Sequence, residues 1–160
     1  MSDQYLDAMS AFATGVTVVT VADGRDDIGA TVTAFGSVSA EPAVISVNVD
    51  SSGYMAEVME EVGAFAVNVL GSSQKALAGR FAAAGRPSAR LLVANQPHDR
   101  GDRTGALVLK EALVALECRV RHTVEVGDHM VFFADVIGLP GVDGRGSALV
   151  RRERRYQDVE

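Results

Sequence analysis

Hydrophobic and polar residues alternate along several short segments of this chain, and the alternation predicts mainly β structure. Residues 15–21 (Gly-Val-Thr-Val-Val-Thr-Val) are almost all β-branched, which favours a strand. Residues 44–49 (Val-Ile-Ser-Val-Asn-Val) alternate with a period of two. The Asp23-Gly24 pair predicts a hairpin turn after the first of these strands. Similar patterns predict further strands over residues 28–33, 35–39, 64–70, 112–124 and 129–139, and a charged edge strand or extended segment over residues 148–156.

Three segments have a helical pattern instead. Residues 2–9 place apolar side chains on one face, and residues 51–63 begin with two serines suited to an N-cap and end at Gly63. Residues 73–83 predict another helix. Residues 85–105 are polar, contain two prolines and have no clean period, so they predict a long surface loop.

Six or seven strands joined mostly by hairpins, with a few short helices, indicate a β-barrel. Strands do not alternate with long helices, as they would in a doubly wound sheet. A chain of 160 residues fits one domain, spanning residues 1–160, and can bury enough surface to fold without disulfides or metals.

Composition narrows the classes of partner. The formal net charge of −6 argues against nucleic acid and anionic membranes. No apolar run reaches the ~18 residues of a membrane span. The single cysteine, Cys118, cannot form an intrachain disulfide, so we expect a cytoplasmic protein. The 48% hydrophobic content suggests that some apolar surface is buried against a second copy.

The common nucleotide-binding motifs and metal-ligand spacings are missing. The chain has no G-x-G-x-x-G after a strand and no Walker loop. His98, His122 and His129 are not spaced as metal ligands, so no metal site is expected. An enzyme of this sequence would take its chemistry from a cofactor.

Two stretches are candidates for binding a cofactor. Residues 29–39 place small and hydroxyl side chains where a strand passes into a loop, and backbone amides there could reach a planar ring. Residues 50–54 follow a strand and open a helix, whose N-terminal N–H groups favour an anion such as phosphate. On the residues alone, a polar strand and a simple N-cap remain the favoured interpretations of these two stretches.

Several blocks together resemble the flavin reductase-like family. Residues 12–20 (Phe-Ala-Thr-Gly-Val-Thr-Val-Val-Thr) are very similar to the family's opening strand, and residues 29–39 match its Gly-Thr-small-Phe-Ser-Val-Ser pattern. Further matches follow in the expected order over nearly the whole chain: residues 65–70, 74–82, 116–120, 127–129 and 154–156.

The resemblance implies an FMN-binding split barrel: a six-stranded antiparallel Greek-key split β-barrel with a few short peripheral helices, which forms a homodimer. The flavin would lie near the dimer interface. Carried over by position, the residues lining the isoalloxazine are Thr31, Val32, Thr33 and Ala34; those holding the ribityl and phosphate are Asp50, Ser51, Ser52, Gly53 and Tyr54; those closing the other side are Arg80 and Phe81; and those meeting the nicotinamide are His129, as the catalytic residue, and Tyr156.

The resemblance also implies an activity, NAD(P)H:flavin oxidoreductase, with reduced flavin passing to a partner monooxygenase. The family commonly has Asn at Thr33, Ser at Ala34 and a small hydroxyl residue at Tyr54. Tyr54 either narrows the pocket or stacks on an adenine, so the choice between FMN and FAD stays open. The sequence also leaves open the choice between NADH and NADPH. The alternatives are a flavin-binding electron carrier and a flavin-dependent oxidase or oxygenase that does not use NAD(P)H. A pure interaction module would bind no flavin.

Overall fold

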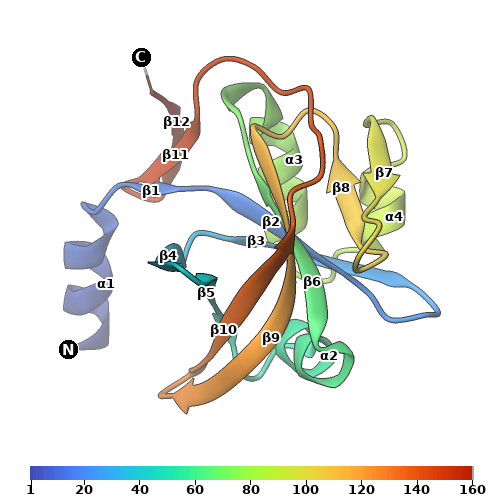
Figure 1. The fold of residues 1–160 in the computed structure, drawn as a ribbon. Coiled ribbons are helices and arrows are strands. Elements are labelled where there is room, and N and C mark those ends of the chain that lie inside the picture. Colours follow the sequence, from blue (N-terminus) through green and yellow to red (C-terminus); the bar gives the residue numbers. More distant parts are fainter. Residues whose placement is uncertain (160) are drawn as a thin grey trace.

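A computed structural model describes residues 1–159, and its ribbon is mainly β structure with short helices at the periphery (Figure 1). The helices are α1 (Ser2–Ser10), α2 (Tyr54–Val62), the 3₁₀ turn η1 (Ser72–Gln74), α3 (Lys75–Ala82) and α4 (Ala89–Leu92). The strands are β1 (Thr14–Gly15), β2 (Thr17–Ala22), β3 (Asp27–Val32), β4 (Phe35–Ala40), β5 (Ala43–Asp50), β6 (Ala64–Val69), β7 (His98–Arg100), β8 (Leu107–Leu109), β9 (Val114–Val126), β10 (His129–Gly138), β11 (Leu149–Arg152) and β12 (Arg155–Asp158). Within this part of the chain, no helix has both the length and the apolar character needed to cross a membrane.

The main sheet has seven antiparallel strands in the order β3-β2-β6-β9-β10-β5-β4, so the expected count of six strands is wrong. Strands β3 and β4 are separate, as residues 28–33 and 35–39 predict, and Thr33 and Ala34 lie between them. These two strands are neighbours in sequence but pair with different partners and lie at opposite ends of the sheet.

The two ends of this sheet approach each other again where β3 ends. The backbone N–H of Asn48 in β5 donates to the carbonyl of Ala34 at 2.9 Å. Residues 33–34 therefore run beside β5 although β3 itself pairs in the sheet only with β2. This contact brings together two segments that the candidate site needs.

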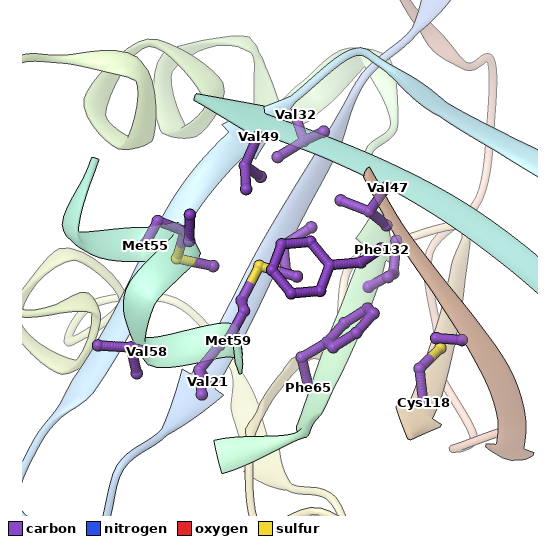
Figure 2. Packing of buried hydrophobic residues seen from close by; sticks show 14 of the residues in the cluster. Val21, Val32, Val47, Val49, Met55, Val58, Met59, Phe65, Cys118 and Phe132 are labelled. Atoms are coloured by element: carbon purple, nitrogen blue, oxygen red, sulfur yellow. The ribbon is translucent and has the colours of Figure 1, made fainter. Parts of the chain in front are cut away.

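The larger core cluster lies between the main sheet and α2. Figure 2 shows Phe132 of β10 and Phe65 of β6 close to Met59 of α2, and all three side chains are fully buried. Helix α2 ends as predicted at Gly63, which adopts a left-handed conformation with φ 70°. The apolar positions of α2 thus supply its attachment to the sheet.

A second core cluster lies under α3 and α4. It contains Phe81 and Leu77 of α3 together with Ala89 and Val93, which come from the segment expected to be a surface loop. The expectation of a long surface loop over residues 85–105 is therefore wrong in part, because the segment contains α4 and β7 and contributes to this core. Ala89 and Val93 are four residues apart, so one side of α4 and its C-cap reaches this core, and Leu92 is partly buried against it.

The C-terminal segment forms the β11–β12 hairpin, and β11 also pairs with β1. Figure 1 shows α1 beside this three-stranded sheet and away from α2 and α3. None of the residues of α1 is buried. The predicted opening helix is confirmed, but none of its residues belongs to a core cluster.

Gly29 of β3 has no room for a side chain. A Cβ there would lie 2.6 Å from Cε1 of Phe81, a fully buried ring. We expect Gly29→Ala to lower the free energy of unfolding by about 1–3 kcal/mol because overpacking displaces this ring. Urea denaturation would measure the loss. Gly79→Ala, in α3 with open space around it, is the control and is expected to be stabilising by about 0.5–1 kcal/mol; equal effects of the two changes would contradict this account.

Candidate functional site

A cavity of about 610 Å³ lies between the outer edge of β3, the end of β5 and the start of α2. The first residue of β10 and the segment 85–88 complete its wall. Eight of the residues predicted to bind cofactor or act in catalysis line it: Thr31, Val32, Thr33, Ala34, Asp50, Gly53, Tyr54 and His129.

Strand β3 presents backbone groups to this cavity. The carbonyl of Gly29 accepts a hydrogen bond from Arg86 Nε at 2.7 Å, on the side of β3 away from β2. Because backbone polar groups alternate along a strand, the N–H and C=O of Thr31 point to the same outer edge. The Thr31 hydroxyl is used elsewhere, since it donates to the carbonyl of Ala78 in α3 at 2.6 Å. A planar ligand at this edge would therefore be bound by backbone groups.

The start of α2 forms the second wall. Asp50 Oδ1 accepts hydrogen bonds from the hydroxyl and the backbone N–H of Ser52, at 2.6 and 2.8 Å, and these bonds lower the pKa of Asp50. The turn leads to Gly53, the N-cap of α2, in an extended conformation. The first N–H groups of α2 are thus exposed beside the cavity, where they favour an anion.

His129 begins β10 and pairs across the sheet with Asp50. Its Nδ1 lies 2.7 Å from Oδ1 of Asp128, and its side chain is 46% exposed. A carboxylate can only accept, so Nδ1 carries a proton and Nε2 remains available to a ligand.

The structure does not bring every predicted residue to the cavity. Ser51 and Ser52 lie in the turn behind it, and Arg80 is exposed on α3. Phe81 lies in the second core cluster, one layer behind Gly29, so it supports the wall without forming its surface. Tyr156 packs against the same cluster from β12, with the Arg151 guanidinium carbon 5.5 Å from its ring centroid.

Sequence reasoning missed the wall formed by residues 85–88. Arg86 is the only Lys or Arg that lines the cavity in the part of the chain that the structure describes. Its NH1 also donates to the carbonyl of Ala83 at 3.3 Å, and burial lowers the pKa of this guanidinium, which stays charged at neutral pH. Ser88 donates to Asp26 Oδ1 at 2.5 Å. In the sequence, the only local indication of an anion-binding group in this segment was the single arginine between Gly85 and Pro87.

The arrangement suits a planar molecule that carries an anionic group. The β3 edge offers backbone donors and acceptors, whereas Arg86 and the start of α2 offer positive charge. Asp26, Asp27 and Asp50 also line the cavity, so it is not uniformly basic. The site therefore favours a ligand with separate polar-ring and anionic parts.

Solved structures with the same fold include flavin reductases. BorF, the flavin reductase component of a bacterial two-component tryptophan halogenase, has a TM-score of 0.91 and 34% identity, covering 99% of this chain and 98% of its own. The NADH:FAD oxidoreductase SgcE6 of Streptomyces globisporus, in complex with NAD and FAD fragments, has a TM-score of 0.89 and 28% identity, covering 99% and 93%.

Sequence relatives agree with the structural ones. The NADH-dependent FMN reductase AsuE2 of Streptomyces nodosus subsp. asukaensis is 35% identical over 153 residues, which are 96% of this chain and 82% of the relative. The reductase component of 4-hydroxyphenylacetate 3-monooxygenase from Thermus thermophilus is 34% identical over 160 residues, with 98% and 96% covered. Residues 9–160 match the flavin reductase like domain as a whole. This chain therefore belongs to the flavin reductase-like family.

Proposed function

We propose that this protein is an NADH-dependent flavin reductase that reduces FMN or FAD. The observation that carries the proposal is the cavity itself, in which the backbone edge of β3 and the Arg86 guanidinium line one space. Relatives that are named NADH-dependent FMN and FAD reductases support the choice of substrates. The proposal extends to NADPH as an alternative reductant, and the assay below compares the two nucleotides.

The residues present fit a flavin mononucleotide moiety. Backbone groups of residues 31–34 would bind the polar edge of the ring, and Arg86 with the first N–H groups of α2 would bind the phosphate. Bound flavin supplies the chemistry, because it accepts a hydride from the reduced nicotinamide.

The protein's own part is to bind and orient. Its backbone donors lie in fixed strand geometry, so they stabilise negative charge on the ring edge with little reorganisation. His129 Nε2, held by the contact of Nδ1 with Asp128, would orient the carboxamide end of the nicotinamide. None of these steps needs a general acid–base pair.

The finer architecture also belongs to this proposal. We infer that residues 1–160 form one domain, a Greek-key split barrel in which the Ala34–Asn48 contact closes the sheet beside the cavity. A homodimer would cover α1, whose exposed apolar side chains are Tyr5, Leu6 and Met9. Size-exclusion chromatography with light scattering would measure the mass.

A partner enzyme and a location complete the proposal. Relatives that are components of two-component monooxygenases or halogenases suggest that reduced flavin passes to a separate flavin-dependent monooxygenase. The unpaired thiol of Cys118, whose pKa burial raises to about 12, is in keeping with a reducing cytoplasm.

Steady-state oxidation of NADH and NADPH, with and without FMN or FAD, tests the activity directly. A rate that depends on added flavin and saturates with it is expected. Flavin binding with no oxidation of either nucleotide would favour an electron carrier or a flavin-dependent oxidase or oxygenase. If the protein bound no flavin at all, the remaining interpretation would be a protein-interaction module without enzymatic activity.

Arg86 gives a sharper test of where the phosphate binds. We expect Arg86→Met to raise the dissociation constant of FMN about tenfold, because a charge-assisted hydrogen bond contributes roughly 1.5–3 kcal/mol. Fluorescence titration would measure it. Riboflavin, which has no phosphate, should bind both proteins equally. Arg80→Met, an exposed change on α3, is the control; an equal loss for riboflavin and FMN would show that Arg86 acts only through the shape of the wall.

A further inference from the structure

Tyr54 is an aromatic side chain left uncovered at the cavity. It is the first residue of α2 and 58% exposed, and it lines the cavity beside Gly53. Among the described residues, the ring belongs to none of the core clusters. The fold therefore does not require an aromatic residue at this position.

The helical period explains why the ring reaches the cavity. Tyr54 and Val58 are four residues apart and so lie on the same face of α2. Val58 is buried, with 2% exposure, against the sheet. At Tyr54, one helical turn before Val58, the same face of α2 borders the cavity instead of the core. Tyr54 therefore lies on the face of α2 that packs on the sheet, but at a point where that face borders the cavity.

The groups around Tyr54 indicate what would lie against it. The N–H groups of the first turn of α2 and the Arg86 guanidinium are the positive features of the cavity, so they define where a phosphate binds. FMN ends at its phosphate, whereas FAD and NADH continue through a second phosphate to adenosine. Because Tyr54 is the first residue of the same helical turn, a group carried beyond the phosphate would come near its exposed ring.

We propose that Tyr54 is a stacking platform for the adenine of a dinucleotide, and that it makes this site discriminate dinucleotides from mononucleotides. Stacking of a base on an aromatic side chain contributes about 1–3 kcal/mol and needs no hydrogen bond from the ring. This inference rests on the proposed function, because it assumes a phosphate at the start of α2. FAD and NADH are its two possible sources of adenine.

Two pairs of ligands distinguish these sources. FAD and FMN differ by adenosine monophosphate, as do NADH and reduced nicotinamide mononucleotide. We would measure dissociation constants of the flavins by fluorescence titration, and KM for the two nicotinamides at saturating FMN. Both sets would be measured for the wild type, Tyr54→Ser, Tyr54→Phe and the control Leu139→Ser, which changes a residue that is 73% exposed and outside this cavity.

The expected result is a selective loss. Tyr54→Ser should weaken binding of one adenine-bearing ligand about tenfold and leave its mononucleotide counterpart within about twofold. Tyr54→Phe should restore that binding, because it keeps the ring. A loss for FAD alone would assign the platform to flavin, and a loss for NADH alone would assign it to the reductant.

Other results would overturn the inference. Equal losses for both members of each pair would mean that Tyr54 shapes the wall, and unchanged or tighter binding of all four ligands would mean that it only narrows the entrance. Failure of the proposed function would look different, since the wild type would then bind no flavin at all.

Discussion

Replacing Phe132 with alanine is expected to lower the free energy of unfolding by about 3–5 kcal/mol. Phe132 lies in the middle of β10, opposite Val47 of β5 and Thr123 of β9, and is fully buried. Figure 2 shows its ring between Met59 of α2 and the sheet. Truncation would leave a cavity that two flanking strands prevent from collapsing, so the cost includes lost contacts as well as lost hydrophobic transfer.

The neighbouring residue is a matched control. Phe133 follows on the opposite face of β10, is only partly buried, and has its ring centroid 6.4 Å from that of His122. We expect Phe133→Ala to cost about 1 kcal/mol, mainly the loss of this aromatic pair. Urea denaturation of both variants would give the comparison. Equal losses would show that the side of the sheet covered by α2 is not the main core.

Strands were predictable where the sequence pattern is local. The β-branched run of residues 15–21 and the alternating run of residues 44–49 correspond to β2 and β5, because burial of one or both faces dictates those patterns directly. Gly63 marked the end of α2 for an equally local reason, its left-handed conformation. The N-cap of α2 was placed one or two residues too early, since Gly53 holds that position and Ser52 binds Asp50 in the preceding turn.

The candidate site was predictable only in part. Residues 31–34 and 50–54 stand next to strand ends, where the resemblance assigned them a role, and most of them do line the cavity. Arg86 was missed because its position depends on a tertiary contact with Gly29, which no pattern in residues 85–105 reveals. Phe81 was assigned to the cavity although it is buried behind Gly29, because sequence does not separate a wall from the layer that supports it.

The ion pair between Arg100 and Asp27 is the basis for a second large effect. The guanidinium of Arg100, in β7, donates through both terminal nitrogens to the two carboxylate oxygens of Asp27 at the start of β3. The Asp27 side chain is only 4% exposed, and its hydrogen bond raises the pKa of Arg100. This pair attaches the segment that contains Arg86 and Ser88 to the strand that forms the cavity wall.

We expect Arg100→Met to lower the free energy of unfolding by about 2–4 kcal/mol, because it leaves the Asp27 carboxylate buried without its partner. Arg100 is itself 49% exposed, which places the effect below that of a fully buried pair. Arg119→Met, at an exposed arginine with no ion pair among residues 1–159, is the control.

The double variant Arg100→Met/Asp27→Leu separates the two contributions to this loss. If the unpaired charge causes most of it, removing the carboxylate as well should recover part of the stability. No recovery would mean that the bidentate contact itself holds residues 85–100 against β3. In that case the variant should also weaken FMN binding as Arg86→Met does, because the wall that carries Arg86 would no longer be fixed.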